Sequence, residues 1–183
     1  MYQSALHEFT STMARAWSPL SSELVSTCRR ALAALTTTSA KENWLAELIR
    51  ERPASKELCR NLEHGFMLLA HTEGQDLYRP PHDHGRSWVV YGVQSGAIEV
   101  RSYAKTPSMG GGHRLVLRGE AVLRPGEARA YLPGDIHDTR CVSGPALLFR
   151  FTERDLRVED QVDGQITRYT EDGHLDRAGH LTP

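Results

Sequence analysis

The sequence contains little cysteine, almost no net charge and no long apolar run, and each shortage excludes a class of protein. Its three cysteines, Cys28, Cys59 and Cys141, are odd in number and widely spaced, which favours reduced thiols over a disulfide framework. A formal net charge of −1 argues against a surface that binds nucleic acid. No stretch approaches the roughly 18 uninterrupted apolar residues of a membrane-spanning helix. We therefore predict neither a nucleic-acid partner nor a membrane segment.

The N-terminus also lacks the basic region and apolar core of a signal peptide, so we expect a cytoplasmic protein. The rest of the composition is ordinary for a globular chain, with 39% hydrophobic and 25% charged residues among 183. This length is sufficient for one domain with a substantial core and an appended segment.

Residues 1–62 are predicted to be helical, because apolar side chains recur there at helical spacing in three stretches. Ser18-Pro19 is a predicted start for the second helix, and Ser39-Ala40-Lys41-Glu42 is a capping-box pattern that should start the third. Pro53 should end that third helix. The apolar positions are Leu6, Phe9, Met13 and Trp17, then Leu24, Cys28, Leu32 and Leu35, then Trp44, Leu45, Leu48 and Ile49.

Residues 63–158 have short apolar or alternating runs between Gly, Pro and Asp turns, which predicts an antiparallel sandwich or barrel. Predicted turns lie at 94–96 and 124–127, with a hairpin tip at 109–112. Residues 159–183 are polar and are predicted to form a C-terminal hairpin and tail of the same domain. The predicted strands are Phe66–Ala70, Trp88–Val93, Ala97–Tyr103, Arg114–Leu117, Glu120–Leu123, Ala128–Leu132 and Ala146–Phe151.

The most informative pattern is the pair His82 and His84 together with the distant His137. Two residues at i and i+2 of a strand point to the same face, and His137 follows a Pro-Gly turn that would direct it back toward the pair. Three imidazoles that converge from two strands can form a facial metal site. The alternative is an accidental, exposed His-x-His in a loop, but a strand-like run just after the pair favours the metal site.

These residues resemble the signature of the cupin superfamily, a His-x-His near one strand pair and a Pro-Gly-x-x-His near another. The second part is here Pro133-Gly134-Asp135-Ile136-His137. Most cupins add a glutamate four or five residues after the second histidine, where this sequence has Trp88 and Val89. The resemblance implies a mainly-β, jelly-roll-like barrel whose metal is held by histidines alone.

A three-histidine site of this kind is similar to that of the cysteine dioxygenase-like thiol dioxygenases, which hold ferrous iron. The N-terminal helical segment before the barrel also resembles these enzymes, and the similarity covers residues 40–155. It implies that His82, His84 and His137 are the iron ligands. In the family, a Ser-His-Tyr arrangement follows the third histidine, but Leu148–Thr152 stands here instead.

Three further residues are candidates for contacts with the substrate. Arg60 resembles the family arginine that pairs with a substrate carboxylate, a task that suits the fork of a guanidinium; the alternative is an arginine exposed to water. Arg150 is expected to face inward as a replacement anion contact, or else to lie on the outside of an edge strand. Tyr91 is a candidate hydroxyl in the cavity, with plain packing as the alternative.

The polar residues next to the histidines are given no ligand role. Asp83 alternates away from its neighbours and is predicted either to be structural or to support the histidines from behind, while Asp135 and Asp138 are predicted turn and surface groups. Cys141 matches no zinc-binding spacing and is predicted to be a buried thiol.

The predicted function is therefore that of a non-haem iron thiol dioxygenase. Three neutral imidazoles leave the full charge on a divalent metal, and a soft thiolate prefers iron to magnesium or calcium. A small thiol, with or without a carboxylate, and O₂ would give a sulfinate. Zinc or nickel would also fit the three histidines.

Two other functions stay open on the sequence. One is another metal-dependent cupin enzyme, a dioxygenase or lyase that acts on a small organic acid or diketone. The other is a non-enzymatic cupin that binds a metal or a small ligand, which the missing Ser-His-Tyr arrangement favours. Barrel edges and apolar helical faces are compatible with either a monomer or a homodimer.

Overall fold

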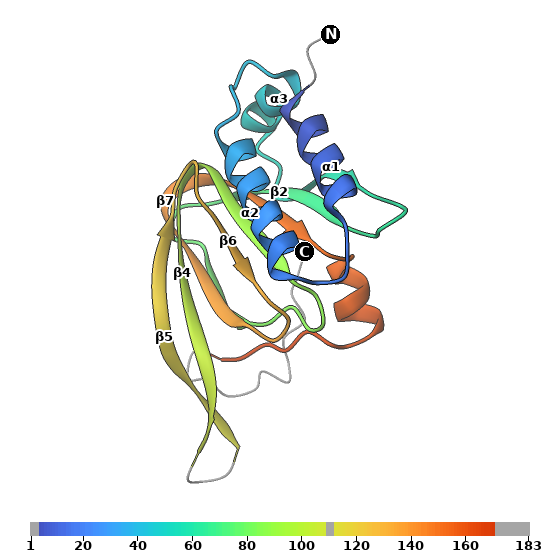
Figure 1. Ribbon diagram of the computed structural model, residues 1–183. Helices are drawn as coiled ribbons and strands as arrows, with labels where there is room; N and C mark the ends of the chain where they lie inside the picture. Colours follow the sequence, from blue (N-terminus) through green and yellow to red (C-terminus); the bar gives the residue numbers. More distant parts are fainter. Residues whose placement is uncertain (1–3, 109–111, 171–183) are drawn as a thin grey trace.

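The computed structural model describes residues 4–108 and 112–170 of the chain, in which three helices precede seven strands (Figure 1). Most of the predicted hairpin tip at 109–112 and the chain after residue 170 lie outside this description. The helices are α1 (Ala5–Ala16), α2 (Ser22–Thr36) and α3 (Asn43–Glu51), and a π-helical turn, η1, covers Val158–Val162. The strands are β1 (Lys56–Arg60), β2 (Met67–Glu73), β3 (Tyr78–His82), β4 (Val89–Pro107), β5 (His113–Leu123), β6 (Ala128–Tyr131) and β7 (Ile136–Thr152).

The helix starts differ in part from the predicted ones. Ser21 caps α2, because its Oγ accepts a hydrogen bond from the Leu24 N–H at 3.2 Å. The predicted capping box before α3 does not form. The Glu42 carboxylate instead accepts the Ala5 N–H at the start of α1 and the indole N–H of Trp44, at 3.1 and 2.6 Å.

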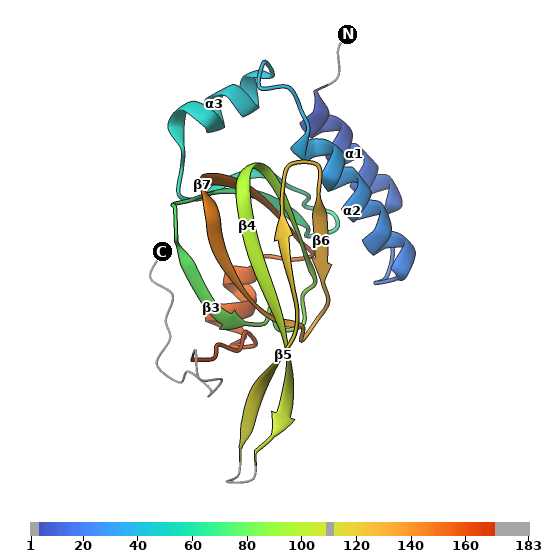
Figure 2. The same ribbon diagram turned by 90° about the vertical axis from the view of Figure 1, so that its left-hand side faces the viewer.

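All strands are antiparallel, and the two longest, β4 and β7, organise the sheet. β7 pairs with β4 along one edge and with β2 and then β3 along the other. β4 in turn pairs with β6 near its start and with β5 further on. The strands β4 and β7 are therefore at the centre of the sheet, with β2 and β3 beside β7 and with β5 and β6 beside β4. The end of the β4–β5 ribbon extends beyond the rest of the molecule (Figure 2). The predicted mainly-β fold class with N-terminal helices is confirmed.

The predicted turn at 94–96 is wrong, because the chain continues through it as part of β4. The pairing of β4 with β7 shifts register between Val93 and Ile98, and Gly96 has a φ of +76° there. Such irregularities bend a strand, so a Gly-rich stretch joins two predicted strands into one. The predicted turn at 124–127 is confirmed by a hydrogen bond from the Glu127 N–H to the Arg124 carbonyl.

The structure has two cores on opposite faces of the sheet. One lies between the helices and the outer face, where Phe149 and Phe151 of β7 contact α1, α2 and α3. The other lies inside the barrel and includes Val89, Tyr91 and Leu148. Because side chains alternate along a strand, Arg150 faces the barrel interior with Leu148, as predicted.

Strands β1 and β3 were not predicted, and β1 lies in the segment that was predicted to be helical. Each is an edge strand of five residues. β3 contains Pro80 and Pro81, which strands normally exclude, and β1 has no alternating pattern. Hydrogen bonds to their neighbours therefore define both strands.

Past η1, residues 163–170 run back along β3, and Arg168 pairs with His82 in an isolated bridge. The described part of the predicted C-terminal hairpin is thus a strand-like segment beside His82. Among the described helices, none is both long and apolar enough to cross a membrane.

Candidate metal centre

The three predicted histidines come together inside the barrel. His82 ends β3 and pairs directly with His137 at the start of β7. The pairing of β3 with β7 is irregular between Arg79 and His82, where the two prolines have no N–H to donate. His84 lies just beyond β3, in a loop closed by a hydrogen bond from the Ser87 N–H to the His84 carbonyl. The pair is thus a strand end and a loop rather than one continuous strand.

The three rings form a nearly equilateral triangle, with centroids 5.1, 5.0 and 5.0 Å apart. One nitrogen from each ring can be chosen so that all three lie within 4.8 Å of one another. His84 and His137 are buried, and His82 is partly buried. Three imidazole nitrogens are a donor set that suits iron, zinc, nickel or copper and not magnesium or calcium, so these residues fit the predicted metal.

Burial keeps the three imidazoles in the neutral form that binds a metal. It is the largest cause that lowers the pKa of each, and the neighbouring histidines lower the pKa values of His84 and His137 further. The Nδ1–H of His82 donates to the Pro80 carbonyl at 2.8 Å. This hydrogen bond leaves Nε2 of His82 with a free lone pair for a metal.

Tyr91 reaches this triangle from β4. Its hydroxyl oxygen lies 3.2 Å from Nε2 of His84 and 3.3 Å from Nε2 of His137, so one oxygen is within hydrogen-bonding distance of both nitrogens. Burial raises the pKa of Tyr91 to about 12, which keeps the phenol protonated. The ring of Tyr131 stacks on His137 with centroids 4.1 Å apart, and its buried hydroxyl has no partner in the described residues.

Arg150 lies beside these residues as a partly buried cation. It is the β7 residue that pairs with Tyr91, and its charge lowers the pKa values of His82 and His84. Its buried Nε has no hydrogen-bond partner in the described part of the chain. Two carboxylates, Glu73 and Asp155, raise the pKa of Arg150 through their charges. Both are already in ion pairs with other arginines, Glu73 with Arg79 and Asp155 with Arg60.

Arg60, the other predicted anion contact, lies at the end of β1 and makes ion pairs. It bonds to Glu57 at 3.1 and 2.9 Å and to Asp155 at 2.9 Å, and these bonds raise its pKa. Its guanidinium therefore already has two carboxylate partners.

Of the neighbouring acids, Asp83 and Asp135 have the predicted structural roles, but Asp138 does not lie on the surface. Asp138 is 1% exposed and accepts hydrogen bonds from Tyr78, Tyr103 and Arg101. It faces away from His137, its neighbour in the chain, because strand residues alternate. Cys141 is buried and free, as predicted.

One residue that the sequence reasoning did not identify is His71, in β2. It is 8% exposed, and its Nε2 has no partner in the described residues. Burial, then Arg150 and Arg79, lower its pKa to about 3. The predicted strand Phe66–Ala70 ended one residue before His71, and β2 does not alternate between buried and exposed residues. The sequence therefore contained no clear signal for this residue.

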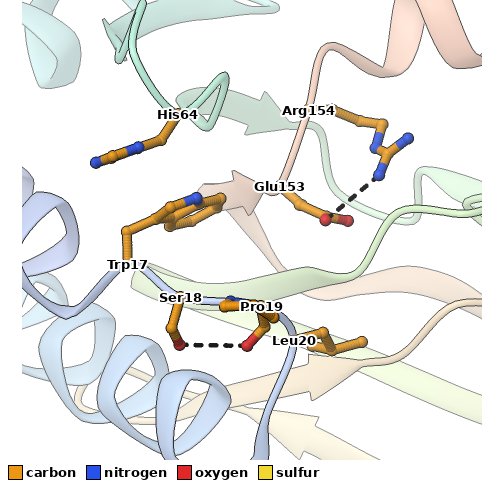
Figure 3. A pocket seen from close by; sticks show the side chains of 7 residues that line it. All are labelled: Trp17, Ser18, Pro19, Leu20, His64, Glu153 and Arg154. Atoms are coloured by element: carbon orange, nitrogen blue, oxygen red, sulfur yellow. Dashed lines mark hydrogen bonds and ion pairs between the residues drawn. The ribbon is translucent and has the colours of Figure 1, made fainter.

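A surface pocket of about 450 Å³ lies between the loop after α1, the loop before β2 and the residues that follow β7 (Figure 3). Its polar groups are engaged with each other, since Arg154 bonds to Glu153 and the Ser18 hydroxyl donates to the Pro19 carbonyl. The ring of His64 stacks on Trp17 with centroids 5.7 Å apart. None of the three clustered histidines lines this pocket.

No protein-family model matches the sequence, and no curated protein matches it either. The chain is similar to several solved structures at low identity. The cupin domain of Cnp3 from Schizosaccharomyces pombe has 13% identity and a TM-score of 0.43, covering 61% of this chain and 66% of that one. KdgF from Halomonas sp. has 18% identity and a TM-score of 0.42, covering 54% and 76%. Oxalate oxidase in complex with glycolate has 20% identity and a TM-score of 0.36, covering 54% and 50%, so this chain spans half of that enzyme.

Proposed function

We propose that this protein is a metal-dependent, cupin-type thiol dioxygenase. The observation that carries the proposal is the triangle of His82, His84 and His137, which no carboxylate joins among the described residues. Ferrous iron bound by these histidines would keep its full charge and would offer adjacent open positions to a thiolate and to dioxygen. The overall reaction adds both atoms of O₂ to sulfur and converts a thiol to a sulfinate, so it needs no external reductant.

Arg150 is the residue we assign to an acidic group of the substrate. A partly buried guanidinium whose Nε has no hydrogen-bond partner in the described residues is costly, and a substrate carboxylate would supply the missing acceptor. Arg60 is not needed for this contact, because Glu57 and Asp155 already occupy its guanidinium. The substrate class that fits best is therefore a small carboxylated thiol.

Tyr91 is the residue we assign to hydrogen bonding at the reacting atoms. Its hydroxyl lies next to the nitrogens that would hold the metal, and its raised pKa makes it a donor at neutral pH. It would replace the hydroxyl that the family provides from the strand after the third histidine, where this chain has Leu148–Thr152.

A metal-dependent reaction on a small organic acid without a thiol is the second candidate. Arg150 also supports this reading, because a guanidinium binds any carboxylate equally well. A substrate without a thiol supplies no soft sulfur donor that would favour iron. Zinc or nickel bound by the three histidines would then serve as well as iron.

The test is metal analysis of protein purified without added metal, followed by O₂ uptake with a substrate panel. The panel is cysteine, 3-mercaptopropionate, cysteamine and a non-thiol diketone. We expect about one iron per chain, uptake with the carboxylated thiols and a sulfinate product. The His82→Ala variant should lose both the metal and the uptake. Iron without thiol-dependent uptake, or zinc or nickel as the resident metal, would overturn thiol oxidation.

A further inference from the structure

The loop that carries His82 and His84 is bound along its outer side by the chain from Val158 to Tyr169, which we call the strap. β3 has β7 on only one edge, so the strap is the neighbour of the loop on the other side. Figure 2 shows this segment in red beside β3.

Backbone hydrogen bonds hold the strap to the residues on either side of His82. The Tyr169 N–H donates to the Pro81 carbonyl at 2.8 Å, and the Asp83 N–H donates to the Thr167 carbonyl at 3.0 Å. The Asp83 carboxylate makes a second bond to the strap, because its Oδ1 accepts the Thr167 N–H at 2.9 Å. The same oxygen accepts the Gly85 N–H within the loop at 3.0 Å. Asp83, between the two histidines, thus fixes the loop to the strap.

A buried carboxylate of the strap holds the far side of the same loop. Glu159 is 1% exposed, and its Oε1 accepts the backbone N–H of Arg86 at 2.8 Å and the Arg86 Nε–H at 2.9 Å. Its Oε2 accepts the Arg86 Nη2–H at 3.0 Å, and Asp163 pairs with the same guanidinium. A full fork of hydrogen bonds therefore starts two residues after His84.

The strap packs so closely that only glycine fits between it and His84. A Cβ on Gly85 would lie 2.8 Å from Oε1 of Glu159 and 2.9 Å from Cβ of Gln165. Gly85 also has a φ of +60°, which favours glycine. The loop conformation that directs His84 inward is thus shaped by the strap itself.

We propose that the strap is part of the metal centre, and that Glu159 and Arg86 are positioning residues that hold His82 and His84 in the geometry for metal binding. The proposal depends on metal binding by the three histidines and not on thiol oxidation. Since coupling between two sites is reciprocal, a metal bound by the histidines should in turn stabilise the strap.

The experiment uses Co²⁺ as a spectroscopic probe on metal-free, full-length protein. Glu159→Gln keeps the shape of the side chain and removes its charge, and the protein should fold because the Arg86 side chain is 52% exposed and can be hydrated. We expect Co²⁺ to bind about 10- to 100-fold more weakly, the usual loss when a group that orients a metal ligand is altered, and its visible spectrum to change. Glu51→Gln is the matched control, because that carboxylate pairs with Lys56 on the surface.

A purely stabilising role would lower the melting temperature of the metal-free variant but leave the dissociation constant and the spectrum of Co²⁺ unchanged, which would overturn the proposal. A measurement on the unaltered protein needs no variant. Co²⁺ should slow hydrogen exchange at the amides of Thr167 and Tyr169, and equal exchange with and without Co²⁺ would also overturn it. If the unaltered protein binds no Co²⁺, the metal centre itself is wrong, a result distinct from loss of the strap effect alone.

Discussion

Tyr91 and Arg150 are opposite each other on the paired strands β4 and β7. Both act on His84, because the Tyr91 hydroxyl lies 3.2 Å from its Nε2 and the charge of Arg150 lowers its pKa. Both face the barrel interior, as their alternation with buried apolar neighbours requires. The site therefore combines a cation with a triangle of neutral imidazoles that could hold a metal. This combination can be tested one residue at a time.

Replacement of Tyr91 by phenylalanine should separate metal binding from turnover. The Tyr91→Phe variant retains the three imidazoles, so we expect its metal content to be unchanged. Its kcat with a carboxylated thiol should fall roughly 10- to 100-fold, the kinetic equivalent of one hydrogen bond to a charged group. Oxygen uptake and metal analysis on the same preparation provide the measurement. Tyr103→Phe is the control, because Tyr103 donates to Asp138 instead, and an unaltered kcat in Tyr91→Phe would remove the hydroxyl from the mechanism.

His71 should make the metal-free protein less stable in acid. Its pKa is about 3 in the fold, whereas an unfolded histidine has a pKa of about 6.5. Below pH 6.5 the unfolded chain therefore binds a proton that the folded chain does not, and stability falls as the pH decreases toward 3. In His71→Gln, the free energy of unfolding should depend less steeply on pH below 6, by up to about 1.36 kcal/mol per pH unit.

Urea unfolding of the metal-free His71→Gln protein at several pH values measures this slope. The exposed His113 provides the control His113→Gln. If His71→Gln and the unaltered protein have parallel stability profiles between pH 6 and 4, His71 does not remain neutral in the fold.

Gly92 should be required where α2 crosses β4. A Cβ at this position would lie 2.9 Å from Cγ2 of Thr36 and 3.1 Å from Cγ of Leu32. Gly92→Ala should therefore lower the free energy of unfolding by roughly 1–3 kcal/mol, the usual cost of overpacking. Gly119→Ala, with no atom within 4 Å of the added Cβ, is the matched control in β5. Equal melting temperatures for the two variants would contradict this contact.

The sequence contains the three clustered histidines in short local patterns, which is why their convergence was predictable. The His-x-His spacing and the Pro-Gly turn before His137 each act over a few residues, and the inward direction of Arg150 follows from strand alternation. The partners of Asp138 and the strap depend on contacts between residues far apart in the chain. Glu159 is 73 positions from Arg86, and no periodicity relates them.

The same distinction explains the missed strands. β3 contains two prolines and gains its strand geometry from β7, so composition argues against a strand that tertiary pairing nevertheless forms. The opposite error occurred at Gly96, where a residue typical of turns forms an irregularity inside β4.

Arg150 should contribute to function at a cost in stability. Its side chain is partly buried, its Nε has no hydrogen-bond partner in the described residues, and burial lowers the pKa of the guanidinium. Arg150→Met, which keeps much of the side-chain volume, should raise the free energy of unfolding by roughly 0.5–2 kcal/mol, as relief of a strained active site commonly does. Its kcat/KM with 3-mercaptopropionate should fall at least about 30-fold, equal to about 2 kcal/mol of lost transition-state binding.

Cysteamine provides the internal control for Arg150, because this thiol has no carboxylate and should lose little activity in the variant. Urea midpoints and steady-state oxygen uptake measured on one preparation give both quantities. The loss of kcat/KM with 3-mercaptopropionate could instead occur in Arg60→Met and not in Arg150→Met. The substrate carboxylate would then bind at the end of β1. The ion pairs of Arg60 with Glu57 and Asp155 would have to break to admit it. If Arg150→Met is less stable than the unaltered protein, an anionic group of the protein pairs with Arg150 in the fold. Arg150 would then have a structural role and would not be available to bind a substrate carboxylate.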